Sequence, residues 1–343
     1  MNHHRKVASI LKYLEQRADI IRAIRQFFYG KGYLEVETPI RIPNPIPEEH
    51  IDPFQSEGWY LQSSPEICMK RLAAQGYSKI FQICKCFRKD ERGDRHLTEF
   101  TMLEWYRKDY SYMELMDECR DMIRYVADKL ISNKTNARSS SMSNVIKNRL
   151  YENGLYIDYG SNHILLSSQW ERITVSEAFK KYARISMQEA EQKGTFDEIM
   201  AFEIEPNLGL ETPTFIYDYP ASRASLAKLK SENFTLNANS LAERFELYIS
   251  GIEIANGFSE LTDPVEQVER LEKEIIKIEQ RHIKEGKNIS TYSKLIQIPE
   301  KFIKDLKKLP PTAGIALGVD RLVMILTNAI TIDELVAFTP EEL

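Results

Sequence analysis

The chain has 343 residues, and 46 Lys and Arg against 51 Asp and Glu give it a formal net charge of −5 at pH 7. That balance argues against a broad basic face for nucleic acid, and a hydrophobic content of 43% without a long apolar run predicts neither a membrane span nor a fibrous protein. The four cysteines lack Cys-x-x-Cys spacing and no secretory signal is visible, so we expect a cytoplasmic enzyme without a zinc site or a disulfide framework.

Helical and strand patterns alternate over the first third of the chain. Apolar residues recur at steps of three and four from Leu11 to Phe28 and predict an amphipathic helix that ends at Gly30. The patterns that follow predict a short strand at 33–37, a helix at 66–74, strands at 80–88 and 98–106 around a charged turn, and a helix at 113–131.

The rest of the chain is more mixed. A Ser-rich stretch at 133–148 predicts a flexible excursion, and weak patterns predict a helical or flexible insertion over about 133–209. Further on we expect a strand pair around Ser250-Gly251, a charged helix at 264–284 and a strand running into a helix at 314–328. Hairpins with irregularly interleaved helices predict a single α+β domain over 1–343, an antiparallel sheet flanked by helices.

The strand pair at 80–88 and 98–106 gathers polar side chains. Alternation places Phe100, Glu104 and Tyr106 on one face of the second strand, and Arg88 at the end of the first. An arginine at a strand end suits bidentate phosphate binding, although on its own it is more simply read as a solvated cap. No P-loop or Rossmann glycine turn is present, so a nucleotide would have to be held by residues of this kind.

The second strand pair predicts a metal site. If Ser250-Gly251 forms a two-residue turn, Tyr248 faces Glu253, and Glu246 lies diagonal to Glu253 on the same face. Two carboxylates this close repel unless a cation lies between them, so Mg²⁺ carrying nucleotide phosphates is the expected occupant. The alternative is a solvated strand face.

A third segment, Gly314 to Arg321, adds a cation. Its small residues let a ligand approach the backbone, and Arg321 can reach a phosphate from the start of the next helix. Glycines before a helix also serve close packing, so this segment alone indicates little.

Together these segments resemble the three motifs of the class II aminoacyl-tRNA synthetases. The similar stretches are Gly32 to Pro39 for motif 1, Phe87-Arg88 with Phe100 to Tyr106 for motif 2, and Gly314 to Arg321 for motif 3. Ile252 to Leu261 is most similar to the lysyl-tRNA synthetase core. The resemblance spans about Glu15 to Phe338 and implies the class II catalytic fold, ATP and Mg²⁺ as cofactors, and a homodimer built around Pro39.

Within that family, the chain resembles the lysine ligases that attach (R)-β-lysine to one lysine of elongation factor P. Lysyl-tRNA synthetases carry an N-terminal OB-fold for the anticodon, whereas the motif 1 helix begins here by about Leu11, so we expect no such barrel. Ser64 and Ala316 stand where those synthetases usually have Ala and Gly, which favours a displaced amino group, although neutral drift in packing also explains them. The implied partners are elongation factor P and (R)-β-lysine, with no tRNA and no membrane.

The resemblance also implies roles for individual residues. Arg88 and Arg321 would be the catalytic cations, on the α- and γ-phosphates. The other expected contacts to ATP are Asp90, His96, Phe100, which would stack on the adenine, and Glu246. The expected substrate contacts are Glu104, Tyr106 and Glu260 for the distal ammonium, Glu66 for the other amine, Asn256 near the carboxylate, and Ser64 and Ala316 along the pocket. Glu246 and Glu253 would ligate Mg²⁺.

The sequence departs from the motif 2 pattern of the family at two places, and three alternative functions remain open. Lys89-Asp90 replaces the usual Asn-Glu, which weakens the expected contact of Asp90 with the adenine region. Leu97-Thr98 replaces the usual Asn-Pro. The alternatives are a truncated lysyl-tRNA synthetase-like core that activates α-lysine, an asparagine synthetase of the same fold and a non-catalytic regulatory paralogue. An acidic substrate would conflict with Glu104 and Glu260, and a paralogue without catalysis has no use for so complete a set of phosphate ligands.

Overall fold

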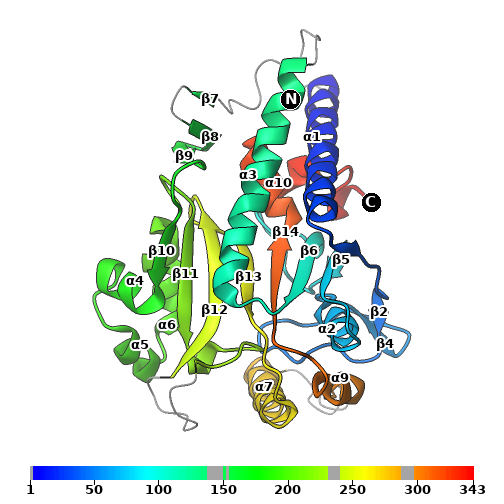
Figure 1. Cartoon of the computed structure of the whole chain (residues 1–343), viewed down its shortest axis with the longest axis vertical. Helices are drawn as coiled ribbons and strands as arrows, with labels where there is room; N and C mark the ends of the chain where they lie inside the picture. Colours follow the sequence, from blue (N-terminus) through cyan, green and yellow to red (C-terminus); the bar gives the residue numbers. More distant parts are fainter. Residues whose placement is uncertain (1–2, 137–149, 152–153, 231–239, 287–296) are drawn as a thin grey trace.

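An eight-stranded sheet with helices packed against it organises the chain (Figure 1). The computed structural model describes residues 3–136, 150–151, 154–230, 240–286 and 297–343. The strand order is β1-β5-β6-β14-β13-β12-β11-β10. The six central strands pair antiparallel, while β1 pairs with β5 and β10 with β11 in parallel at the two edges. The predicted α+β fold is therefore confirmed, with parallel edges that the sequence did not indicate.

Helices and strands alternate irregularly along the chain. The main-sheet strands are β1 (Leu34–Glu35), β5 (Lys79–Phe87), β6 (Glu99–Lys108), β10 (Glu171–Thr174), β11 (Thr214–Pro220), β12 (Leu241–Ile249), β13 (Ile252–Ser259) and β14 (Thr312–Gly318). Two small sheets hold β2 (Arg41–Ile42), β3 (Gln55–Ser56) and β4 (Trp59–Leu61), and β7 (Leu150–Tyr151), β8 (Gly154–Tyr159) and β9 (Asn162–Leu165). The helices include α1 (His3–Gly30), α2 (Glu66–Ala74), α3 (Tyr112–Asn136), α4 (Val175–Tyr182), α5 (Met187–Lys193), α6 (Phe196–Ile199), α7 (Pro264–Lys284), α9 (Glu300–Leu306) and α10 (Val319–Thr327).

Short 3-10 and π turns complete the chain. They are η1 (Met200–Ile204, a π-helix), η2 (Glu205–Asn207), η3 (Ala221–Arg223), η4 (Ile332–Leu335) and η5 (Pro340–Glu342). The sequence predicts α2 and α7 with these bounds, and α7 begins where Asp263 accepts hydrogen bonds from the backbone of Val265 and Glu266.

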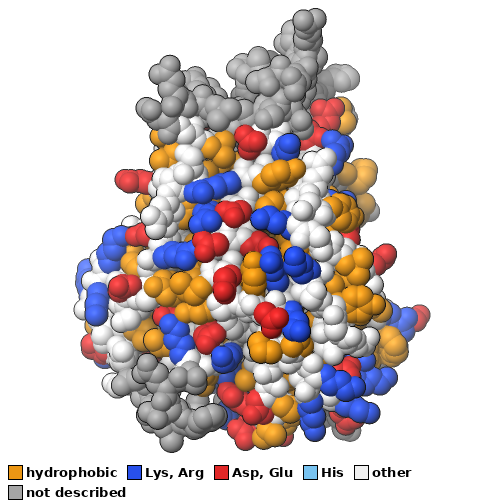
Figure 2. Space-filling view, in the orientation of Figure 1, with side chains coloured by type: hydrophobic (Ala, Val, Ile, Leu, Met, Phe, Trp, Pro, Cys, Tyr) orange, Lys and Arg blue, Asp and Glu red, His pale blue; other side chains and the backbone are white. Residues whose placement is uncertain are grey.

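One face of the sheet forms the core. It packs against α1, α3 and α10, and the ring of Phe28 on α1 lies 4.8 Å from that of Phe81 and 5.1 Å from that of Trp105. On the surface that Figure 2 shows, basic and acidic side chains are interspersed, without a broad field of one sign. Within the described ranges, no helix is both long and apolar enough to cross a membrane. A second apolar cluster, with α4 to α6, covers the β10–β12 end of the opposite face, and the rest of that face carries polar groups.

Residues 150–174 differ from the expected insertion. The stretch 133–209 does contain helices α4 to α6, but it also contains strands β8, β9 and β10, and β10 pairs with β11 in the main sheet. Strand β10 has four residues and runs directly into α4, so its alternation is too short to separate it from a helix. Most of the expected excursion at 133–148 lies outside the described residues, and the single-domain assignment stays a prediction.

Gly209, in the segment before β11, packs closely against the backbone at the end of β12. Gly209 has φ of 71°, and a Cβ there would lie 2.8 Å from Ile249 Cα and overlap the Tyr248 carbonyl oxygen. We expect Gly209→Ala to lower the free energy of unfolding by about 2 kcal/mol or more, because strain and a backbone clash add. Gly160→Ala, at φ of 57° with open space around it, should cost only about 1 kcal/mol. Urea unfolding measures both, and equal losses would contradict the clash.

Candidate active site

A row of paired residues crosses the polar face of the sheet. Glu104 on β6 is paired with Gln82 on β5 and with Ala316 on β14. Ala316 is paired with Asn256 on β13, which is paired with Glu246 on β12. Residues paired across adjacent strands project to the same face. The register therefore brings four of the predicted site residues, from four segments of the chain, into one line.

The β12–β13 hairpin positions the two carboxylates expected to bind metal. Ser250 and Gly251 have φ of 55° and 69°, as a type I′ turn requires, and Tyr248 is paired with Glu253 as predicted. A bulge next to Leu247 shifts the register beyond that pair. It places Asn256 opposite Glu246, where an unbroken hairpin would place residue 255.

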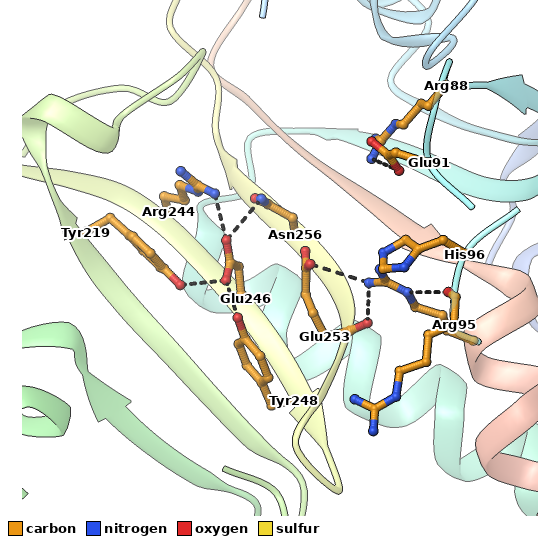
Figure 3. Close-up of polar contacts among 11 residues, drawn as sticks. Arg88, Glu91, Arg95, His96, Tyr219, Arg244, Glu246, Tyr248, Glu253 and Asn256 are labelled. Carbon is orange, nitrogen blue, oxygen red and sulfur yellow. Dashed lines mark hydrogen bonds and ion pairs between the residues drawn. The ribbon is translucent and has the colours of Figure 1, made fainter. Parts of the chain in front are cut away.

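Glu246 is held from four sides (Figure 3). One carboxylate oxygen lies 2.6 Å from Arg244 Nη2 and 3.3 Å from Asn256 Nδ2. The other accepts hydrogen bonds from the hydroxyls of Tyr219, at 2.6 Å, and Tyr248, at 2.8 Å. These donors keep the carboxylate in a single orientation at the edge of the site.

Glu253, Arg321 and His96 form a second group. Arg321 Nη1 donates to the Glu253 carbonyl oxygen at 2.9 Å and lies 3.4 Å from its carboxylate, while Arg321 Nη2 contacts His96 Nε2. Burial, together with the cations Arg321 and Arg88, lowers the pKa of His96 to about 4. His96 is therefore neutral at pH 7 and accepts a hydrogen bond from Arg321. Burial, together with the charge of Glu246, raises the pKa of Glu253.

A cavity of about 240 Å³ lies between these groups and the first hairpin. Its lining residues include Arg88, Glu91, His96, Phe100, Glu253, Asn256, Ala316 and Arg321. The Arg88 guanidinium lies 5.2 Å from the centre of the Phe100 ring and 3.8 Å from the Glu91 carboxylate, and its Nε has no hydrogen-bond partner among the described residues. Cations and an aromatic ring around one cavity are suited to a nucleotide.

Asp90 is not brought into this cavity. It is exposed with φ of 64°, and its neighbour Glu91 is the residue that lines the cavity. The sequence aligns Asp90 with a carboxylate of motif 2, and the structure places it in an exposed turn beside Glu91. The contact of Asp90 with ATP stays a prediction.

A cluster of buried acidic side chains, here called the acidic pocket, lies at the other end of the row. Ser64 and Tyr106 both donate their hydroxyls to Glu104, with the Tyr106 bond at 3.1 Å, and the Glu66 backbone N donates to Ser64 Oγ at 3.0 Å. Burial and then the charge of Glu66 raise the pKa of Glu104 well above its ordinary value. Burial therefore opposes ionisation of the Glu104 carboxyl, and an ammonium group bound beside it would favour the ionised form.

Sequence reasoning missed two residues of this region. Lys70 is 1% exposed, and its Nζ lies 2.5 Å from a carboxylate oxygen of Glu66 and 2.5 Å from one of Glu260. Its only sequence signal is a Glu66–Lys70 spacing of four on a predicted helix. Glu48 lines both the cavity and the small space beside Ser64, and burial raises its pKa to about 7. It lies in a Pro-rich loop, where no pattern indicates it.

A larger cavity, of about 400 Å³, lies elsewhere. It is lined by Arg120 and Arg124 of α3, Arg172 of β10 and neighbouring residues, and includes none of the predicted site residues. Phe215 lines it and is paired with Leu247, which faces the core side of the sheet. The smaller cavity, which several of the predicted site residues line, is therefore the candidate active site.

Comparison with known proteins shows which family this chain resembles. Residues 4–342 match the family described as tRNA synthetases class II (D, K and N). The chain is 37% identical to the elongation factor P--(R)-beta-lysine ligase of Pectobacterium carotovorum subsp. carotovorum (strain PC1), over 98% of this chain and 96% of the relative. It is 36% identical to the protein of the same name from Pectobacterium atrosepticum, with the same coverage, and 35% identical to that of Enterobacter sp. (strain 638), over 95% and 94%.

Proposed function

Because the chain belongs to the class II tRNA synthetase family and, within it, to the elongation factor P--(R)-beta-lysine ligases, we propose that it activates (R)-β-lysine with ATP and transfers it to a lysine of elongation factor P. Family membership makes it an ATP-dependent ligase. The observation that carries the substrate proposal is the row from Glu104 to Glu246, which joins an acidic pocket to a cavity lined by cations.

The proposed chemistry has two steps. An oxygen of the substrate carboxylate attacks the α-phosphorus of ATP, pyrophosphate leaves, and an aminoacyl adenylate forms. The ε-amine of the acceptor lysine then attacks the acyl carbon, AMP leaves, and the nitrogen loses a proton as the amide forms. In the first step, Arg88 would neutralise the charge at the α-phosphate and Arg321 that at the γ-phosphate, while Asn256 would orient the carboxylate between them.

The acidic pocket would bind the two amines. Glu104, Tyr106 and Glu260 would surround the distal ammonium, because a buried cation needs several acceptors, and Glu66 would bind the second amine. Ser64 and Ala316 would set the position of that second amine. The amine of β-lysine is displaced by one carbon from that of α-lysine, and the Ser64 hydroxyl and the Ala316 methyl group are changes of the size that could distinguish the two.

The carboxylates of the second hairpin fit Mg²⁺ that arrives with the nucleotide. Among the described residues, no group of three or more His, Cys, Asp or Glu is arranged to hold a metal ion by itself. Glu246 and Glu253 would therefore supply two protein ligands and the phosphates the others, as is usual for Mg²⁺. Bound there, the ion would neutralise developing phosphate charge, while Tyr219, Tyr248 and Arg244 keep Glu246 oriented.

Pyrophosphate exchange followed by transfer tests the proposal. We expect ATP–pyrophosphate exchange with (R)-β-lysine to exceed that with α-lysine, and expect radiolabelled β-lysine to appear on elongation factor P and not on lysine tRNA. Efficient charging of tRNA without modification of the protein would overturn the proposal in favour of a synthetase core. Binding of an amino acid without exchange would favour a regulatory paralogue.

We also propose a homodimer in the cytoplasm. Large apolar side chains are exposed around the motif 1 segment, at Tyr29, Leu34, Ile40 and Trp59, each at least 42% exposed. Exposed apolar groups that cluster on one segment are typical of an interface. Light scattering coupled to size exclusion should give twice the 39.9 kDa chain mass, and a monomer would contradict this.

Binding of the amino acid should depend on pH. Burial raises the pKa of Glu260 above its ordinary value, and Lys70 opposes this only in part. The ionised carboxylate is the form that binds an ammonium, so kcat/KM for the amino acid should rise as the pH increases through the raised pKa and fall as the pH decreases below it. Initial rates of exchange between pH 6 and 9 at saturating ATP measure this, and a flat profile would contradict the role of Glu260.

A further inference from the structure

A buried lysine bridges two acids of the proposed substrate pocket. Lys70 comes from α2, and its ammonium lies 2.5 Å from Glu66, one turn earlier on that helix, and 2.5 Å from Glu260, which follows β13. The rings of Phe258 and Phe302 lie 5.1 Å and 6.0 Å from the same nitrogen. Burial alone would lower the pKa of Lys70, but the two carboxylates outweigh it and raise the pKa, so the ammonium stays charged.

The 2.5 Å contact with Lys70 is made by Oε2 of Glu260. Among the described residues neither Glu260 oxygen has a hydrogen bond of regular geometry, and Oε1 is the one farther from Lys70. Space beside this oxygen depends on Gly314, because a Cβ there would overlap Oε1 and lie 2.7 Å from Tyr106 Cδ1. An unpaired buried carboxylate oxygen is costly, so Oε1 is prepared to accept from a ligand.

We propose that Lys70 is a positioning residue that fixes Glu260 through Oε2 and thereby presents Oε1 to the ammonium of the substrate. Lys70 also supplies one positive charge against the three acids Glu66, Glu104 and Glu260. This inference rests on the proposed function.

The first test separates binding of the amino acid from binding of ATP. In Lys70→Ala, we expect the KM for the diamino acid in exchange to rise about tenfold or more, because Glu260 loses its orientation, while the KM for ATP changes little. Added propylammonium, which replaces the missing chain and charge, should restore much of the KM, and propanol should not. An unchanged KM for the amino acid in Lys70→Ala, or equal rescue by propanol, would overturn the proposal.

Arg107→Met is the matched control. Arg107 is paired with buried Glu118 at 2.8 Å, and it neighbours Tyr106 on β6, so its side chain projects to the opposite face of the sheet. This variant should lose stability without changing the KM for either substrate. A rise in the KM for the amino acid equal to that of Lys70→Ala would show a general effect of destabilisation and would overturn the proposal.

A second test does not depend on activity. Thermal unfolding of Lys70→Met, Glu260→Gln and the double variant should show a loss in Tm for the double variant that is smaller than the sum of the single losses. If Lys70→Met does not fold, the double variant should fold again. Additive losses, or a double variant that remains unfolded, would overturn the bridge. If the unmodified chain shows no exchange with any diamino acid, the proposed function fails, and this cycle still decides the role of Lys70.

Discussion

Glu260→Gln is expected to lower amino-acid-dependent pyrophosphate exchange by about 10²- to 10³-fold, because the amide cannot neutralise a buried ammonium. Glu260 is 2% exposed, one of its oxygens contacts Lys70, and the other lies beside Tyr106 and Gly314. Gln has nearly the same size, so the fold should persist, and circular dichroism with thermal unfolding checks this. The loss should lie mainly in kcat/KM for the amino acid and not in the KM for ATP.

Glu118→Gln is the control for that variant. Glu118 is 6% exposed and accepts hydrogen bonds from Tyr33, Trp105 and Arg107 on the core side of the sheet. The same substitution there should cost stability and leave exchange within about twofold. Retained exchange in Glu260→Gln would mean that the acidic pocket is not where the amino acid binds.

The sequence predicts which side chains share a face of each strand, because side chains alternate between the two faces of any strand. Glu104 and Tyr106 share one face of β6, as the period of two predicts, and Tyr248 is paired with Glu253, as the Ser250-Gly251 turn predicts. Family motifs then joined segments that are far apart in the chain, which alternation alone cannot do. The class II family expected from those motifs is confirmed over residues 4–342.

The remaining features depend on contacts that no local pattern encodes. The bulge that sets Asn256 opposite Glu246 depends on how β13 fits between β12 and β14. The Lys70–Glu260 bridge joins residues 190 positions apart and forms only when α2 docks under the sheet. The contact of Asp90 with ATP stays a prediction, since motif position predicts a residue's place in the chain and not its φ of 64°.

At the proposed nucleotide end of the site, Arg88 stacks on an aromatic ring and has only a distant carboxylate partner. Arg88 lies over the Phe100 ring at 5.2 Å, its nearest described carboxylate is Glu91 at 3.8 Å, and its Nε is buried without a hydrogen-bond partner among the described residues. Glu246, by contrast, has all its oxygens engaged. A guanidinium that stacks on an aromatic ring and has N–H donors without partners is suited to bind an anion through two parallel hydrogen bonds.

Arg88→Lys should therefore lower kcat for exchange by about 10²- to 10³-fold although the positive charge remains, because an ammonium cannot provide the planar pair of donors or stack on Phe100. Arg92→Lys is the control in the same loop, since Arg92 is paired with Asp333 and Glu341 and does not line the cavity. It should leave exchange within about twofold. Exchange kinetics at saturating ATP and amino acid measure both variants. Near-normal kcat in Arg88→Lys would mean that charge alone suffices and that Arg88 does not grip the α-phosphate through paired hydrogen bonds.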